Sequence, residues 1–273
     1  MFDINIVNDK FIYPYEKNLN LQNNFIQAEP FPNIVIRNFF EDKFLTSVLN
    51  DFPDLEKTNN TQRYNNKNEL KFANNNYDQF PKSIKKLFDF LNSKVFLEFL
   101  QKITSIEEKL ISDPELNGGG LHQIKKGGVL KIHTDFNKHP TKNLDRRVNL
   151  LLYLNKDWED SYGGHLELWD KDMKKCFQKI KPDFNTMVIF NTNDFSNHGH
   201  PDPLNCPISL SRKSIATYYF SAGRPKSEIN SKLYKNTTYF KNRIGHINEI
   251  SQKSEKFKNF LRSFKFYQKL KDI

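Results

Sequence analysis

The sequence predicts a mainly β fold with flanking helices (α+β), and three features of the chain support this. From Gly118 onward, short apolar runs are separated by turns at the spacing of seven or eight strands, which is typical of an antiparallel sandwich or barrel. Before Gly118, three segments have apolar residues at helical spacing. The chain has 273 residues, of which 37% are hydrophobic and 25 are Phe, so it can form one large domain with a substantial core.

Residues 1–110 are predicted to form a strand and supporting helices. The strand is predicted over residues 32–39, and a helix is predicted to run from Glu41 until Pro53 ends it. Two more helices are predicted to follow and to bury one apolar face each. These faces consist of Ile84, Leu87, Phe88 and Leu91 on the first helix, and of Phe96, Phe99, Leu100 and Ile103 on the second.

One long stretch, Lys57–Tyr77, is rich in Asn and has no usable hydrophobic period. We therefore predict a loop here. Loops of this length are uncommon in compact domains and are often either disordered or functional. This stretch is accordingly a candidate lid over a bound substrate.

The predicted core spans residues 111–224, and a basic helical extension is predicted for residues 225–273. Together the three parts form a single predicted domain over residues 1–273. The core strands are predicted in residues 118–126, 129–135, 147–155, 163–170, 176–182, 186–191, 197–200 and 211–220. In the extension, an apolar stripe from Phe257 to Leu270 is most simply a helix packed on the core, with a membrane-surface helix or a helix that pairs with a partner chain as alternatives.

Composition excludes several classes of protein. The formal net charge is +10, yet the sequence has no spacing typical of a specific nucleic-acid reader. No apolar run reaches the roughly 18 residues that a membrane span needs, and the first residues do not resemble a secretory signal. Only Cys176 and Cys206 are present, so a disulfide framework is excluded. We expect a protein of a reducing compartment, the cytoplasm.

The strongest chemical signal is a histidine and an aspartate that follow a strand-like run. His133 and Asp135 are one residue apart at the end of Val129–Ile132, so both side chains should project to the same side. A histidine nitrogen and a carboxylate oxygen on one side are two thirds of a three-ligand metal site. The alternative is a surface pair without a metal.

Two histidines downstream, His198 and His200, could supply the third ligand. The stretch between Asp135 and His198 can hold about four strands, which in a double-stranded barrel return the chain to the same end. Two histidines and one carboxylate leave coordination positions open, as in non-haem Fe(II) oxygenases. Zinc also accepts these ligands, so the three residues alone do not determine the metal.

A carboxylate clamp is predicted on the next strand. Arg212 and Ser214 are two residues apart and therefore share one face. Arginine holds a carboxylate through two parallel hydrogen bonds, and a serine hydroxyl can add a third. A metal site followed by such a clamp suits a dicarboxylic keto acid, whose keto-acid end binds the metal.

In these motifs the chain resembles the 2-oxoglutarate/Fe(II)-dependent oxygenases of the prolyl-4-hydroxylase-like branch. The resemblance covers residues 118–224, and its motifs occur in the family's order. They are His133-x-Asp135, Leu150–Trp158, Gly163–Trp169, His198 and Arg212-x-Ser214. The resemblance implies a double-stranded β-helix core, also called a jelly roll or cupin-like fold. It also implies Fe(II), 2-oxoglutarate and O2 as cofactors, with ascorbate as a candidate stimulant.

The resemblance also assigns roles to residues. Tyr153 falls where relatives have a tyrosine that helps to bind the 2-oxoglutarate carboxylate, and Asn149 shares its face. Relatives usually have His-x-Val at the third ligand, so His198 is the expected ligand, and His200 takes the valine position either as a pocket residue or as a hydrogen-bond donor next to the ligands. His122 is either another pocket residue or a packed histidine.

The implied activity is hydroxylation of an unactivated C–H bond, first of all in a prolyl residue of a peptide or protein. A small-molecule substrate such as a free amino acid, a sugar or a lipid-linked intermediate is an alternative, since this fold serves many substrates. A non-catalytic cupin-like binding domain and a nucleic-acid-binding enzyme of the demethylase kind are further alternatives. No specific nucleic-acid partner is expected, and the oligomeric state is left open.

Overall fold

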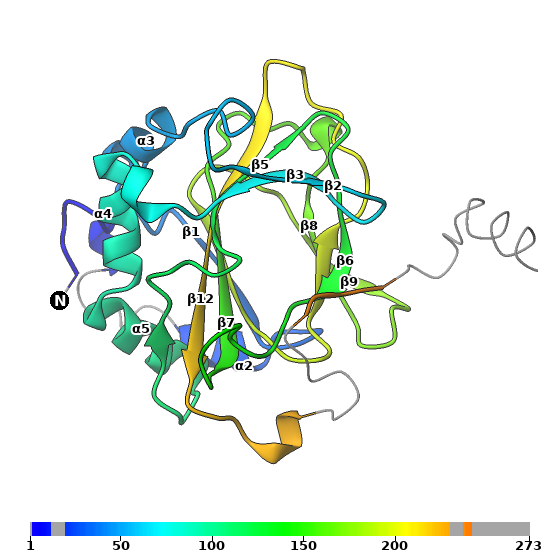
Figure 1. The fold of residues 1–273 in the computed structure, drawn as a ribbon. Coiled ribbons are helices and arrows are strands. Elements are labelled where there is room, and N and C mark those ends of the chain that lie inside the picture. The colour runs from blue at the N-terminus through cyan, green and yellow to red at the C-terminus, as the bar shows by residue number, and fades with distance from the viewer. Residues whose placement is uncertain (1, 12–19, 230–236, 242–273) are drawn as a thin grey trace, which may run out of the picture. The chain divides into compact units, whose positions relative to one another are not determined.

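The computed structural model describes residues 2–11, 20–229 and 237–241 (Figure 1). The apolar stripe that begins at Phe257 lies outside these residues, so the predicted C-terminal helix and the division into three parts stay predictions. Within the described ranges, no helix is both long and apolar enough to cross a membrane. Cys176 and Cys206 are both free.

The strands form two antiparallel sheets (Figure 1). In the part of the chain that the structure describes, the larger sheet has the order β1-β10-β7-β12-β5-β3-β2 with β4 beside β12, and the smaller has the order β13-β6-β11-β8-β9. The strands are β1 (Asn33–Arg37), β2 (Gln62–Asn65), β3 (Leu70–Asn74), β4 (Ile111–Ser112), β5 (Gly120–Lys125), β6 (Leu130–Thr134), β7 (Asp145–Tyr153), β8 (Leu166–Trp169), β9 (Cys176–Ile180), β10 (Thr186–Asn191), β11 (Asn197–His200), β12 (Ser211–Ser221) and β13 (Tyr239–Phe240).

Strands β5 to β12 form a jelly roll. The larger sheet takes β5, β7, β10 and β12 from this series, and the smaller takes β6, β8, β9 and β11. The chain therefore crosses between the sheets repeatedly, and apolar side chains from both sheets, such as Val188 and Leu168, pack in one cluster. All eight predicted core strands are confirmed, and with them the predicted jelly-roll fold.

The helices pack on the outer face of the larger sheet (Figure 1). These helices are α2 (Leu21–Ile26), α3 (Asp42–Asn50), α4 (Lys82–Leu91) and α5 (Lys94–Thr104). Elsewhere in the described residues the chain forms the short 3-10 turns η1 (Asp9–Phe11), η2 (Tyr77–Gln79), η3 (Asp160–Tyr162) and η4 (Lys226–Glu228). The eight apolar residues predicted on the faces of α4 and α5 are all buried, which confirms both helices. The strand predicted at 32–39 and the helix predicted after Glu41 are confirmed with slightly shorter bounds, as β1 and α3.

Alternation along β7 separates the core from the site. Val148, Leu150 and Leu152 belong to the cluster that the helices cover. Asn149, Leu151 and Tyr153 line a cavity between the sheets. Successive strand residues point to opposite faces, so one strand serves both the core and the site.

The predicted loop over Lys57–Tyr77 is wrong, because most of this stretch is a β-hairpin. Strand β2 pairs with β3, and β3 pairs with β5 and so extends the larger sheet. The hydrophobic period is missing because β2 faces water on both sides: three of its four residues are exposed. Three hairpin residues, Tyr64, Glu69 and Lys71, line the cavity between the sheets. Whether the hairpin closes over a substrate stays a prediction.

Candidate metal and co-substrate site

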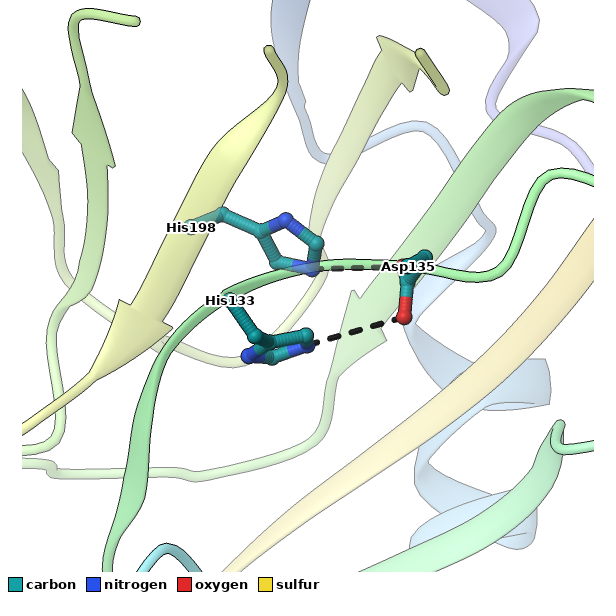
Figure 2. Close-up of side chains that lie close together, drawn as sticks. All are labelled: His133, Asp135 and His198. Carbon is teal, nitrogen blue, oxygen red and sulfur yellow. Dashed lines mark ion pairs between the residues drawn. The ribbon is translucent and has the colours of Figure 1, made fainter. Parts of the chain in front are cut away.

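Two neighbouring strands of the smaller sheet bring three predicted ligands together. His133 is near the end of β6, Asp135 follows one residue after the strand, and His198 on β11 is paired directly with His133. The Nε2 atom of His133 is 3.6 Å from Asp135 Oδ1, and Nε2 of His198 is 3.4 Å from Asp135 Oδ2. Figure 2 shows both imidazole rings turned toward the carboxylate. The potential ligand atoms lie within 4.8 Å of one another, a spacing that a single metal ion can bridge.

Backbone contacts set the tautomers of both rings. The Nδ1 atom of His133 is 2.8 Å from the carbonyl oxygen of Lys131, and Nδ1 of His198 is 2.9 Å from that of Ser196. A carbonyl oxygen only accepts, so both Nδ1 atoms carry the proton, and in a neutral ring Nε2 then has a free lone pair. Burial, together with the neighbouring His133, lowers the pKa of His198 to about 4, so its ring is neutral near pH 7. Lone pairs that face a carboxylate repel it unless a cation lies between them.

Asp135 is held in place by two donors from β7. Arg146 donates from Nη2 to Asp135 Oδ2 at 2.9 Å, and Asn149 donates from Nδ2 to the same oxygen at 2.6 Å. Burial alone would raise the pKa of Asp135, but the positive charge of Arg146 keeps that pKa well below its usual value. The carboxylate is therefore ionised, and its Oδ1 atom is left on the side of His133.

The cavity between the sheets has a volume of about 210 Å³ and contains all the predicted site residues. The metal-binding candidates line it, and so do Tyr153, Arg212 and Ser214. The pocket candidates His122, Asn149 and His200 also line it. The structure thus brings together every side chain that the sequence pointed to, from five strands of both sheets.

Arg212 is a buried cation without a carboxylate partner among the described residues. It is 5% exposed, donates from Nε to the carbonyl oxygen of Gly164 at 2.8 Å, and donates from Nη2 to the hydroxyl of Tyr153 at 3.2 Å. Ser214, also buried, is paired with Tyr153 across β12 and β7. A buried charge is costly unless an opposite charge pairs with it, so this part of the cavity suits an anion.

Gly164 makes room for Arg212. A Cβ atom at this position would lie 3.0 Å from Arg212 Cδ and 2.5 Å from Leu204 Cδ2, and the backbone has a φ of +72°. Only glycine combines this conformation with so close an approach. This explains why the second residue of the pair Gly163-Gly164, in the motif Gly163–Trp169, is a glycine.

Aromatic rings surround the metal-binding candidates on another side. Phe136 and Tyr218 meet edge to face with ring centroids 6.3 Å apart, and the guanidinium of Arg146 lies 3.3 Å from the centroid of Tyr218. Phe240, on β13, packs 5.4 Å from the ring of His133. The sequence did not point to Arg146, Phe136 or Phe240. Only Arg146 offered a signal, since it lies near the start of a strand that continues into the apolar run Leu150–Leu152, and a charged residue next to such a run suggests a buried role.

A second group of potential ligands, Asp113, Glu115 and His139, is better explained without a metal. The Nδ1 atom of His139 accepts hydrogen bonds from the backbone amides of Thr141 and Lys142, at 3.2 and 3.1 Å. In the neutral ring, Nε2 then carries the proton and faces Asp113 Oδ1 at 3.8 Å. This nitrogen has no lone pair for a metal.

Comparison with known proteins identifies the class of the core. Residues 119–220 match the family described as the 2OG-Fe(II) oxygenase superfamily. This match, the jelly roll and the geometry of the site agree, so the core belongs to that superfamily, and the resemblance inferred from the sequence motifs is confirmed. Fe(II) and 2-oxoglutarate, the expected cofactors, are those of the superfamily.

Relatives in sequence and structure include prolyl hydroxylases. The chain is 24% identical over 221 residues to prolyl 3-hydroxylase OGFOD1 of Mus musculus, covering 77% of this chain and 37% of the mouse protein. Its fold is similar to that of a prolyl hydroxylase of Trichoplax adhaerens solved with a hypoxia-inducible-factor peptide, with 19% identity, a TM-score of 0.54 and coverage of 76% and 92% of the two chains. It is also similar to HygX of Streptomyces hygroscopicus, solved with nickel, 2-oxoglutarate and hygromycin B, with 13% identity, a TM-score of 0.51 and coverage of 82% and 97%.

Proposed function

We propose that this chain is a Fe(II)- and 2-oxoglutarate-dependent dioxygenase that hydroxylates an unactivated C–H bond of a prolyl residue in a peptide or protein. One observation carries the proposal: two imidazoles direct their Nε2 atoms at one ionised carboxylate, in the same cavity as a buried arginine that has no counterion within the described part of the chain. The first group of residues suits a divalent metal and the second suits an anion. A keto acid with a distal carboxylate joins the two.

In this proposal His133, Asp135 and His198 hold Fe(II). Arg146 and Asn149 orient Asp135 through its Oδ2 atom and leave Oδ1 available to the metal. The backbone carbonyls of Lys131 and Ser196 keep the proton on Nδ1 of each histidine, which is the tautomer that a metal bound at Nε2 requires. His198 is favoured over His200 as the third ligand, because only His198 lies within reach of Asp135.

Arg212, Ser214 and Tyr153 bind the distal carboxylate of 2-oxoglutarate in this proposal. Arg212 already bonds to Gly164 and Tyr153, which fix its orientation before the ligand arrives. Burial raises the pKa of Tyr153, so its hydroxyl keeps its proton near neutral pH. When bound, iron and 2-oxoglutarate would supply the oxidation: 2-oxoglutarate would lose CO2 and take up one atom of O2 to become succinate, and the other oxygen atom would enter the C–H bond of the substrate.

The proposed substrate rests on the aromatic rings and on the relatives. Phe136, Tyr218 and Phe240 give the metal an apolar surrounding, which suits a saturated ring and limits the access of water. OGFOD1 and the Trichoplax adhaerens protein are both named as prolyl hydroxylases. HygX was solved with a small molecule, and the fold alone does not choose between the two classes of substrate.

Substrate-dependent release of succinate tests this function. Fe(II)-loaded protein with 2-oxoglutarate is incubated with proline-containing peptides and, separately, with amino acids, sugars and lipid-linked intermediates. The proposal expects that a peptide stimulates release, that the peptide gains one oxygen atom on a prolyl residue, and that its Pro→Ala counterpart is inactive. Stimulation by small molecules alone would move the assignment to the small-molecule hydroxylases. Failure to bind 2-oxoglutarate would favour a cupin-like binding domain.

We also infer that the protein works in a reducing compartment, the cytoplasm. The support is that Cys176 and Cys206 both remain free thiols. Cys176 is only partly buried, so an oxidising compartment would expose its thiol to oxidation. We further infer one oxygenase domain, in which residues 1–110 support the core at 111–224.

Gly164→Ala should weaken the binding of 2-oxoglutarate, because the added methyl group displaces Arg212 and Leu204. We expect a loss of roughly 5- to 150-fold in affinity, corresponding to about 1–3 kcal/mol for an overpacked site. Calorimetric titration of the metal-loaded protein measures the affinity. Gly163→Ala is a matched control: Gly163 has a similar φ of +71°, but its added Cβ would come no closer than 3.9 Å to another atom. Equal losses in the two variants would assign the effect to backbone strain instead.

A further inference from the structure

His200 is buried in the co-substrate cavity but lacks a partner. It is 2% exposed and lines the cavity with Arg212 and the metal-binding candidates. Neither ring nitrogen has a partner with ordinary hydrogen-bond geometry among the described residues, and the backbone of Asp202 offers only a weak contact. Burying a polar group without a partner costs free energy, so such a group in a cavity indicates a ligand.

His200 does not belong to the metal site. On β11 it lies two residues beyond His198, a distance of roughly 7 Å along a strand. It is paired with Leu130, whereas His198 is paired with His133, and the pairing shifts between these two positions. Gly199, between them, allows β6 to approach closely, since a Cβ there would lie 2.7 Å from the carbonyl oxygen of Leu130. His200 is accordingly not part of the cluster formed by His133, Asp135 and His198.

Two cationic side chains, Arg212 and Lys71, line the same cavity as His200. Lys71 does not need His200 as a partner, because it forms an ion pair with Glu69 at 3.2 Å. Arg212 has no carboxylate partner in the described ranges. A ligand carboxylate at Arg212 is therefore the partner that His200 can share.

Resting on the proposed function, we propose that His200 donates a hydrogen bond from its imidazole to the distal carboxylate of 2-oxoglutarate, across the cavity from Arg212. Arg212 and Ser214 reach this carboxylate from the larger sheet, and His200 reaches it from the smaller one. The carboxylate is thus held between both layers of the jelly roll. A hydrogen bond from a neutral ring to a charged group is stronger than a bond between two neutral groups.

Two variants and two ligands test this contact. His200→Val fills the space with an apolar side chain suited to a strand, and His200→Gln keeps an N–H donor. The ligands are 2-oxoglutarate and 2-oxopentanoate, which has the same keto-acid end and chain length but no distal carboxylate. Calorimetry with Mn(II) in place of Fe(II) gives each dissociation constant without turnover.

For 2-oxoglutarate, His200→Val should raise the dissociation constant about 10-fold, and His200→Gln should stay within about threefold of the wild type. For 2-oxopentanoate, the wild type and His200→Val should bind alike. Without ligand, His200→Val should unfold at a higher temperature than the wild type, because it no longer buries unpartnered nitrogens. A histidine that only packs would leave every dissociation constant unchanged.

Two results would overturn the inference alone: equal affinity of the wild type and His200→Val for 2-oxoglutarate, or equal loss for both ligands, which would place the contact elsewhere. If the Mn(II)-loaded wild type binds no 2-oxoglutarate at all, the proposed function is overturned together with this inference. The two kinds of failure are therefore distinguishable in the same titration.

Discussion

Replacing His133, Asp135 or His198 by alanine is expected to abolish Fe(II) binding and turnover. Loss of a residue that only supports a ligand typically weakens metal binding 10- to 100-fold, so loss of a ligand should exceed about 100-fold. Each of the three residues supplies one atom to a compact cluster, and the described residues offer no replacement within reach of that cluster. Anaerobic titration with Fe(II), or with Mn(II) as a redox-inert substitute, measures the affinity.

Two other histidines provide the controls for this series. His200→Ala should keep the metal, since its ring lies outside the cluster. His165→Ala should also keep it, because His165 lies beside Asp160, at 3.3 Å, and not in the cavity. If His200→Ala loses the metal while His198→Ala keeps it, the assignment of the third ligand is wrong.

Arg212→Ala is expected to weaken 2-oxoglutarate binding by more than 100-fold while Fe(II) binding stays nearly unchanged. Removing one partner of a buried ion pair costs about 3–5 kcal/mol, because the other charge is left buried and unpaired. Arg212→Lys should recover only part of the loss, since a single ammonium cannot make the two-pronged contact. Ser214→Ala should cost about 1 kcal/mol, the usual contribution of one hydrogen bond.

The apparent constant for 2-oxoglutarate at saturating iron measures these effects. Lys213→Ala is the matched control: the lysine adjoins Arg212 on β12, but its ammonium lies on the other face, 6.0 Å from the ring centroid of Phe52. It should bind 2-oxoglutarate like the wild type. A wild-type constant for Arg212→Ala would place the carboxylate clamp elsewhere and remove the main support for a dicarboxylic co-substrate.

Much of the core could be predicted because apolar and polar residues alternate along some of its strands, while other strands are apolar throughout. In β7, every second residue faces the helices and the others face the cavity, so the sequence places Asn149 and Tyr153 on one face. The same alternation places His133 and Asp135 together. It does not distinguish His198 from His200, which have the same parity; their separation comes from the shifted pairing of β11 with β6.

Other parts of the site depend on contacts between distant segments and leave little trace in the sequence. Strand β2 is exposed to water, and β3 is held by pairing with β5. The hairpin therefore has no hydrophobic period that the sequence could reveal. Phe240 reaches His133 only because β13 adds to the edge of β6, well beyond the predicted core. Arg146 contacts Asp135 between the two sheets, and only the assembled jelly roll brings these strands together.

Anaerobic addition of Fe(II) and 2-oxoglutarate to the wild-type protein tests most directly whether one cavity holds both. A keto acid bound through two oxygens to Fe(II) has a visible charge-transfer absorption, which neither component gives alone. We expect this absorption to appear only with both components, to be lost in Asp135→Ala, and to require far more 2-oxoglutarate in Arg212→Ala. Absence of the absorption in the wild type, or wild-type behaviour of both variants, would contradict the assignment.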